Sequence, residues 1–434
     1  QKKKGKRLTA KKKKRKLYIK RSIGSAVSAI TIGLCIVASS MMLQAGNTLS
    51  NIADNVVVTD TVSVYVLADN PAVSVADVKD GVFAITQNYD YEHTKTTLDQ
   101  INENLGQDIH TQNFDTVFDM VDALYAQNVD AIILNAAYVD VIKDQKGYED
   151  FAKKTKTLYD HEVQTTVVKD DTGHTKSITE DPFVIYISGS DTRNQKLATS
   201  RSDVNILAVV NPKTKQVLLL NTPRDYYVYL PNQGANDKLT HAGLYGVESS
   251  EAAIENLYGI NIDYYVRMNF SGFEAIIDTL GGIDVYSEYD FTVDPIKHYT
   301  VGYNHVSGLE ALAFARERHA FAAGDVQRGI NQMEVIKAVI NKMTSPSILA
   351  KYGEILDEVA DCVMTDIPSN VIYDLVKYKL SNDVTWTIDS YTVTGTGKHT
   401  TTYSMPGTTC YVMIPNDQDV ENAKSLIESV LDEE

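Results

Sequence analysis

Apolar positions in the first part of the chain follow two periods, one typical of strands and one typical of helices. The run AIILN (131–135) is short and flanked by polar residues, as in a buried strand, whereas 116–126 spaces its apolar residues three and four positions apart, as on one face of a helix. The alternation of these patterns predicts a small α/β unit. Extended segments are predicted at 62–68, 82–86, 109–114 and 131–135, and helices at 92–105, 116–126 and 138–159.

Three extended runs in the middle of the chain, predicted at 183–187, 204–210 and 216–221, each have charged residues at one end. The five-residue turn between the second and third runs makes those two antiparallel. If the first pair is antiparallel too, the meander gathers the charges at one edge of a sheet. Taken singly, each charge would be explained as a turn residue or a weak surface pair, and only their joint arrival predicts a site. The charged residues are Asp191, Arg201, Asp203, Arg224 and Asp225.

Further along, Arg316, Arg318 and Arg328 lie within thirteen residues, and Gln332 follows the last of them by one helical turn. A guanidinium presents a rigid planar fork of donors that matches phosphate oxygens. An Arg-x-Arg pair taken alone would indicate a solvated basic face. Together with the charged residues of the meander, the cluster instead predicts a clamp for a pyrophosphate.

The same region contains several helical patterns. A helix is predicted to start at Gly324–Asp325 with Asp325 as its N-cap, so that Arg328 and Gln332 lie near its positive end. Other helices are predicted at 250–258, 271–280 and 308–314, with a strand at 264–268. The apolar stripe of the helix that follows Asp325 is predicted to consist of Val326, Ile330, Met333, Ile336, Ile340 and Met343.

Beyond residue 346, amphipathic patterns predict helices at 348–361, 369–380 and 417–431, and VTWTI predicts a strand at 384–388. The segment TGTGKHTT (394–401) superficially resembles a phosphate-binding loop. It lacks the four-residue gap and the Ser or Thr after the lysine, so we do not assign it that role.

Charge is distributed unevenly. Residues 1–22 carry thirteen Lys or Arg and no acid, so the rest of the chain is near −29, thirteen units more negative than the formal −16 of the whole. Residues 23–43 then run for 21 positions without a charge, enough to cross a hydrocarbon core of about 30 Å as a helix. A cleavable signal peptide is the alternative, but its apolar region normally spans only about 7–15 residues. The positive-inside rule predicts a cytoplasmic N-terminus, with the chain from 45 on outside the cell.

Few residues suggest zinc or redox chemistry. Cys362 and Cys410 lie in the predicted extracellular part, where a disulfide and two buried thiols are both compatible with the sequence. The histidines lack the spacing of zinc ligands, so we expect them to be ordinary polar residues. The acidic extracellular part is also unsuited to nucleic-acid binding.

Several motifs occur in a fixed order. They are GSDTR, RSDVN, TPRD, DKLTHAGLYG, LGGIDV, GLEALAFARERH and GDVQRGINQ. In combination they resemble the catalytic domain of the LytR-CpsA-Psr (LCP) family of Gram-positive cell-wall enzymes, over about 180–345 by motif. The whole layout is similar to CpsA-type capsule proteins of streptococci. The expected division is a cytoplasmic basic tail (1–22), a transmembrane helix (23–43), a small α/β accessory domain (56–168) and an α/β LCP catalytic domain with a mixed central sheet flanked by helices (180–434).

The resemblance implies a site for a polyprenyl (pyro)phosphate, with the lipid tail in an apolar tunnel. By the family's pattern, Asp191 and Asp203 would hold Mg²⁺. The phosphates would be bound by Arg201, Arg224, Arg316, Arg318, Arg328 and Gln332. Arg224, Arg316 and Arg318 are also the catalytic candidates. Asp225 is a further candidate from its position alone, either to orient Arg224 or to accept the proton of the acceptor hydroxyl.

The activity implied by the resemblance is a Mg²⁺-dependent phosphotransfer. A capsular polysaccharide or related glycopolymer would pass from a polyprenyl pyrophosphate carrier in the membrane to peptidoglycan, and hydrolysis of the pyrophosphate would use the same donor site. Wall teichoic acid is the alternative cargo. The alternative function is a membrane-bound regulator of capsule expression whose basic tail contacts nucleic acid, although orientation and contact with anionic lipid explain that tail more simply.

Overall fold

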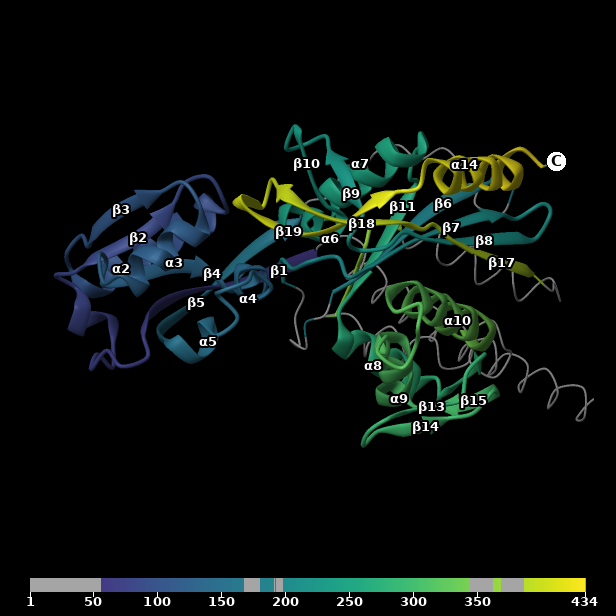
Figure 1. The fold of residues 1–434 in the computed structure, drawn as a ribbon, viewed down its shortest axis with the longest axis horizontal. Helices are drawn as coiled ribbons and strands as arrows, with labels where there is room; N and C mark the ends of the chain where they lie inside the picture. Colours follow the sequence, from purple (N-terminus) through teal and green to yellow (C-terminus); the bar gives the residue numbers. More distant parts are fainter. Residues whose placement is uncertain are drawn as a thin grey trace, which may run out of the picture.

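The computed structural model describes residues 56–167, 180–190, 192, 198–343, 362–367 and 386–433. We call 56–167 the N-terminal lobe and the described residues from 180 on the C-terminal lobe. The two lobes follow one another along the long axis of the molecule (Figure 1). The basic tail, the predicted membrane helix and the predicted helices at 348–361 and 369–380 lie outside these ranges. Within them, no helix combines the length and apolar character needed to cross a membrane.

The N-terminal lobe is built on a five-stranded sheet of order β3-β2-β4-β1-β5, in which β2 pairs in parallel with β3 and β4, and β1 pairs antiparallel with β4 and β5. The predicted α/β alternation is therefore present. Its elements, with η marking a 3₁₀ helix, are β1 (Val56–Leu67), η1 (Val75–Val78), β2 (Val82–Thr86), α2 (Tyr91–Leu105), β3 (His110–Phe114), α3 (Val117–Tyr125), β4 (Ala131–Asn135), η2 (Ala136–Tyr138), α4 (Val139–Lys143), α5 (Phe151–Lys154) and β5 (Thr155–Val167).

The helix predicted over 138–159 is wrong. The helix α4 ends at Lys143, Gly147 takes a φ of +97°, and the long strand β5 begins at Thr155. β5 pairs with β1 along its whole length, from Thr155 opposite Leu67 to Val167 opposite Val56. Its many β-branched residues favour an extended chain, and this long-range pairing outweighs the local helical pattern.

The C-terminal lobe contains a six-stranded mixed sheet of order β16-β11-β6-β7-β8-β17. Pairs β6–β7 and β7–β8 are antiparallel, which confirms the predicted meander, while β11 and β17 run parallel to β6 and β8. The lobe's elements are β6 (Phe183–Gly189), β7 (Val204–Asn211), β8 (Gln216–Asn221), β9 (Tyr227–Leu230), β10 (Ala235–Lys238), α6 (Leu239–Ala242), η3 (Gly243–Tyr245), α7 (Val247–Tyr258), β11 (Tyr264–Met268), α8 (Phe270–Thr279), β12 (Ile283–Ser287), β13 (Phe291–Val293), β14 (Lys297–Tyr299), β15 (Gly302–Val306), α9 (Gly308–Arg316), α10 (Asp325–Met343), β16 (Val363–Thr365), β17 (Thr387–Thr392), β18 (Gly395–Thr402), β19 (Met405–Pro415) and α14 (Asp417–Asp432).

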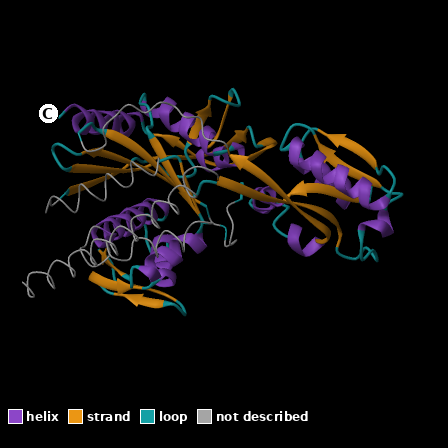
Figure 2. Cartoon of the chain, turned by 180° about the vertical axis from the view of Figure 1, so that it is seen from behind, coloured by secondary structure: helices purple, strands orange, loops and turns teal. Residues whose placement is uncertain are grey.

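The two faces of this sheet have different surroundings. Helices α7 and α14 cover one face and close a core around Tyr186, Leu207 and Leu220. Helices α8, α9 and α10 lie beyond the other face, with the small strands β12 to β15 outside them (Figures 1 and 2). Residues of alternate parity on β6 and β7 point to these two sides, as the pleat of a strand requires. A mixed α/β fold with helices on both faces of the sheet is therefore confirmed.

The helix α10 departs from the prediction in detail. Asp325 is its first residue rather than its N-cap. Of the predicted stripe, Met333 is buried but Val326 and Ile330 are only partly so, whereas Asn331 and Gln327 are buried. The helix therefore turns a mixed face toward its neighbours, because α9 supplies a carbonyl, that of Phe314, for the Asn331 side chain at 3.2 Å.

Two further points of the sequence analysis concern residues 394–401 and the two cysteines. The segment 394–401 belongs mostly to β18, which pairs antiparallel with β19, so it is not a phosphate loop. Cys362 and Cys410 are both buried, and no disulfide bond joins them.

Candidate functional site

The centre of the predicted site is an ion pair between Asp203 and Arg224. Asp203 lies just before β7, and Arg224 follows β8, so the antiparallel pairing brings them to the same edge of the sheet. The Arg224 Nη1 donates to Asp203 Oδ2 at 2.9 Å, and Thr240 Oγ1 donates to Asp203 Oδ1 at 2.9 Å. Both side chains are largely enclosed, with 14% of Asp203 and 18% of Arg224 exposed. Each oxygen of the carboxylate is thus held by a separate donor.

The charge state of Asp203 depends on a wider set of arginines. Burial raises the pKa of Asp203, but the positive charges of Arg224 and Arg201 act in the opposite direction. The hydrogen bond from Thr240 and the charge of Arg328 add to that effect, so the pKa of Asp203 lies below its usual value. The carboxylate is therefore ionised at neutral pH. Arg201, Arg224 and Arg328, which come from three different parts of the chain, are thus all close enough to Asp203 to lower its pKa.

Arg316 and Gln332 meet at a second feature, an apolar cavity of about 510 Å³ whose wall includes both residues. Arg316 ends α9, and its guanidinium carbon lies 4.6 Å from the centre of the Phe270 ring at the start of α8. Stacking of this kind holds the planar cation in place without using its in-plane donors. Arg316 is exposed, so the guanidinium stands at the cavity wall with access to solvent.

The cavity runs along the sheet face that α8, α9 and α10 overlie. Its wall includes both ends of β6, from Phe183 to Ser190, a span of about 23 Å for an extended strand. Ile185 and Ile187, in the middle of that strand, are only partly buried although they lie in the centre of the sheet, because they face this space. The space is therefore a long apolar channel that reaches the charged edge of the sheet.

Two predicted site residues are placed less fully. Arg318 lies in the loop after α9, two residues beyond Arg316, and its Nε donates to His319 Nε2 at 3.4 Å. Because Arg316 is still helical, the extended segment that would put both side chains on one face is not formed. Asp191, the other predicted metal ligand, lies outside the described residues. Within the described ranges, no three His, Cys, Asp or Glu side chains are grouped as a metal site would need.

Sequence reasoning assigned no role to Lys238 or Thr240, although both lie in the quoted motif DKLTHAGLYG. Lys238 Nζ lies 3.3 Å from Asp225 Oδ1, and Arg224 Nε lies 3.8 Å from Asp225 Oδ2. Asp225 is only 7% exposed and thus sits between two cations. The motif itself was the signal, since it places a lysine and a threonine two residues apart beside the predicted edge.

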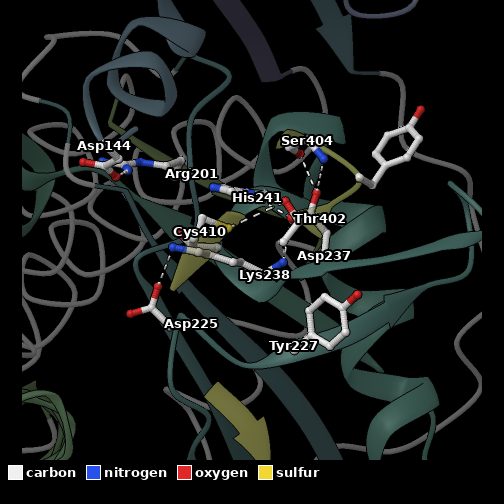
Figure 3. A network of polar contacts seen from close by, with 12 residues as sticks. Asp144, Arg201, Asp225, Tyr227, Asp237, Lys238, His241, Thr402, Ser404 and Cys410 are labelled. Atoms are coloured by element: carbon white, nitrogen blue, oxygen red, sulfur yellow. Dashed lines mark hydrogen bonds and ion pairs between the residues drawn. The ribbon is translucent and has the colours of Figure 1, made fainter. Parts of the chain in front are cut away.

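His241 in the same motif is also more than an ordinary polar side chain. Its Nδ1 lies 2.7 Å from Asp237 Oδ1, and both residues are almost fully buried. Ser404 donates to the other oxygen of Asp237 through its backbone N–H at 2.8 Å and its hydroxyl at 2.5 Å, as Figure 3 shows. Burial opposes ionisation of Asp237, but the charge and hydrogen bond of His241 and the bonds from Ser404 keep its pKa below the usual value. This pair braces the turn that carries Lys238 and Thr240.

Comparison with known proteins gives one family. A model described as the LytR_cpsA_psr family matches residues 141–424, more than half of the chain. The match includes all the site residues discussed above and begins inside the N-terminal lobe.

Individual relatives agree with this match. A protein of Bacillus anthracis named polyisoprenyl-teichoic acid–peptidoglycan teichoic acid transferase TagU is 35% identical over 198 residues, which cover 45% of this chain and 64% of the relative. A protein of the same name from Enterococcus faecalis is 33% identical over 224 residues, covering 51% and 72%. The solved structure titled "TagT bound to LIIa-WTA" is 27% identical, with a TM-score of 0.50, and covers 61% of this chain and 97% of that one. This chain thus spans less than two thirds of the length of the first of these relatives.

Proposed function

Because the chain belongs to the LytR_cpsA_psr family, we propose that it transfers a glycopolymer from a polyprenyl phosphate-type carrier to peptidoglycan. The observation that carries this proposal is the junction of two unlike surfaces. A long apolar channel has Arg316 and Gln332 in its wall, together with Val204, the residue that follows Asp203 of the Asp203–Arg224 ion pair. A lipid pyrophosphate has the same two parts, an apolar chain and a charged head group. The relatives named as teichoic acid transferases support the same class of reaction.

The chemistry follows from this placement. The hydroxyl oxygen of the acceptor attacks the phosphorus that carries the glycopolymer, and the bond from that phosphorus to the bridging oxygen breaks. The polyprenyl phosphate leaves with the bridging oxygen, and the hydroxyl proton passes to it or to solvent. Charge builds up on the phosphate oxygens in this step, and arginines preorganised around them stabilise it. Arg224 is fixed by Asp203, and Arg316 is fixed by Phe270, so both forks are already oriented. Arg201, Arg318 and Arg328 would complete the charge balance.

A divalent cation fits this set in part. Asp203 is an ionised, hard oxygen ligand, and its carboxylate keeps lone pairs beyond those used by Arg224 and Thr240. Mg²⁺ usually binds through one or two protein carboxylates together with phosphate oxygens and waters. Asp203 would hold the ion with Asp191, the ligand predicted from the sequence, and the ion would supply charge neutralisation at the pyrophosphate. Arg224 would then share Asp203 with the metal, which ties the arginine and the cation to the same phosphate.

Asp225 has two proposed roles, and its contacts support the first. It lies between Arg224 and Lys238, at 3.8 and 3.3 Å, so it can hold both cations toward the site. As a general base it would instead have to accept the proton of the acceptor hydroxyl. Because both cations lie within ion-pair distance of its carboxylate oxygens, we propose the orienting role for Asp225.

The cargo we propose is a capsular polysaccharide or wall teichoic acid, and the names of the relatives support the second. We also propose that residues 23–43 anchor the chain in the cell membrane with the site outside, where enzyme and lipid carrier share one leaflet. Water in place of the acceptor would give hydrolysis of the pyrophosphate at the same donor site. Transfer and hydrolysis then differ only in the nucleophile.

The test is a transfer assay with the full chain in detergent, a lipid-linked teichoic acid and peptidoglycan. We expect product with Mg²⁺, at least a hundredfold less with chelator, and a comparable loss in Arg224→Ala, since a single preorganised charge donor contributes about 10²–10³-fold to a step of this type. Lys153→Ala, at an exposed lysine of the N-terminal lobe, is the matched control and should leave the rate unchanged. Full activity of Arg224→Ala would refute the site assignment.

A further inference from the structure

The segment that carries Arg201 is held from two sides. On the inner side, Arg267 of β11 is 3% exposed and reaches both neighbours of Arg201. Its Nη2 donates to the carbonyl of Ser200 at 2.5 Å and to the Ser200 hydroxyl at 3.0 Å, and its Nη1 donates to the Ser202 hydroxyl at 3.0 Å. A buried guanidinium has a fixed geometry, so these bonds set the path of the backbone at 200–202.

On the outer side the contacts come from the N-terminal lobe. Asp60 of β1 is 1% exposed and accepts hydrogen bonds from the backbone N–H of Thr199 at 2.7 Å and from its hydroxyl at 2.9 Å. Asp144, the residue that follows α4, accepts a hydrogen bond from Arg201 Nη1, and Figure 3 shows the two side chains pointing toward one another. The lobe thus grips the segment at its backbone and at the guanidinium.

These carboxylates are presented by a rigid support. Val141 and Ile142 of α4 are fully buried, in a cluster that also contains Leu244 and Val412 of the C-terminal lobe. The lobes therefore share one hydrophobic core next to Asp144. The backbone that carries Asp144 is therefore held in place by packing, although the Asp144 side chain itself is 51% exposed.

We propose that the N-terminal lobe is a positioning element of the phosphate site, in which Asp60 fixes the backbone before Arg201 and Asp144 orients its guanidinium. The proposal rests on the proposed function for the role of Arg201 in anion binding. It gives the N-terminal lobe a task in the reaction, and Asp144 is a positioning residue rather than a catalytic one. Arg201 is 8% exposed, so a small change in its orientation changes which donors face the site.

Whether anion binding becomes stronger or weaker when Asp144 is replaced distinguishes a positioning role from simple competition of its charge with the anion. Replacing Asp144 by Asn removes one negative charge near the arginines. By Coulomb's law alone this would strengthen binding of an anion. Loss of the oriented guanidinium acts in the other direction, so weaker binding identifies positioning.

The experiment uses the full chain with Asp144→Asn, the conservative rescue variant Asp144→Glu, and Asp140→Asn as matched control. Asp140 lies in α4, four residues before Asp144, is similarly exposed and pairs with Lys143 rather than with the site. The first readout needs no ligand: the rate at which phenylglyoxal modifies Arg201, followed by peptide mass spectrometry, with Arg224 as internal reference. We expect several-fold faster modification of Arg201 in Asp144→Asn, and unchanged rates in Asp140→Asn.

The second readout is the dissociation constant of inorganic pyrophosphate. We expect it to rise about tenfold in Asp144→Asn, as for loss of one well-placed charge-assisted hydrogen bond, and to recover in Asp144→Glu. An unchanged Arg201 reactivity, or a dissociation constant that stays equal or falls, would overturn the proposal. If Arg201 becomes reactive but the unmodified protein does not bind pyrophosphate, the positioning contact stands and the proposed function fails.

Discussion

Asp203 and Asp225 lie on either side of Arg224, and each carboxylate also binds a second donor, Thr240 or Lys238. Such a network resists rotation of any single side chain, because moving one breaks contacts of another. Under the proposed function, Arg224 would therefore need little reorganisation to bind a phosphate. This preorganisation is what distinguishes a binding site from a group of surface charges.

Glu251 of α7 makes the stability of the fold depend on pH. Burial, together with the charges of Asp366, Glu248 and Glu255, raises the pKa of Glu251 to about 9. Because the pKa of Glu251 in the folded protein lies above its unfolded value, its contribution to the stability of the fold is fully present below about pH 4.5. That contribution is lost as pH rises toward 9. The native carboxyl thus costs stability at neutral pH.

We therefore expect Glu251→Gln to raise Tm by about 2–4 °C at pH 7.5, on the order of 1 kcal/mol, and to give no gain at pH 4. Thermal unfolding at the two pH values measures this. Glu421→Gln on α14, at an exposed carboxylate, is the control and should show no such pH dependence. An equal change in Tm at both pH values would contradict the assigned cause.

Among single residues, the sequence predicted the meeting of those that lie at the same end of neighbouring strands. It missed those that the other lobe contributes. Arg224 and Asp203 were found because the meander forces their meeting. Asp144 was not, because it lies in a turn of the other lobe and the sequence around it does not encode its contact with Arg201. Only the tertiary fold brings it to Arg201.

Among the elements, helices α8 and α9 both contribute side chains to the channel wall, and their backbones are in close contact. A Cβ on Gly308, the first residue of α9, would lie 2.3 Å from the carbonyl oxygen of Glu274 on α8. Backbone atoms cannot move aside as a side chain can. The two helices therefore approach to a distance that only glycine permits.

Gly308→Ala should lower the free energy of unfolding by about 1–3 kcal/mol, because the two helices must separate. Leu309→Ala, at the next and largely exposed position, is the matched control and should cost less than about 0.5 kcal/mol. Chemical denaturation of both variants gives the comparison. Equal stability of the two would show that α8 and α9 yield freely at this contact.

Prediction of elements succeeded where a local period and a buried face agree, as for β4, α3 and the β6–β8 meander. It failed for β5, whose charged and aromatic positions also fit a helix. Strand β5 is specified by its partner β1, about a hundred residues earlier at the centre of the pairing, where Val62 lies opposite His161, and no local period encodes that contact.

In the whole molecule, the two lobes share a hydrophobic core at their junction, in which Leu244 and Met405 pack with Phe118 and Ile142. Aromatic contacts such as that between Tyr89 and Tyr403, 6.1 Å between ring centres, continue this junction. The predicted division at 56–168 and 180–434 stays a prediction, and the sequence contains no signal for the shared core, which depends on contacts far apart along the chain.

We propose that one site binds both parts of a lipid pyrophosphate, with the head group at the arginines and the tail in the channel. The most direct measurement compares binding of a polyprenyl pyrophosphate and of inorganic pyrophosphate to three variants of the full chain. Arg224→Ala removes a head-group donor. Val266→Phe and Ile185→Trp each extend a partly exposed channel side chain into the cavity.

We predict that Arg224→Ala weakens both ligands by about tenfold or more, whereas each channel variant weakens only the lipid, by a similar factor. Inorganic pyrophosphate should bind the channel variants as it binds the unmodified protein, which also confirms that they fold. Lipid binding that is insensitive to both channel variants, or that survives Arg224→Ala unchanged, would contradict the claim.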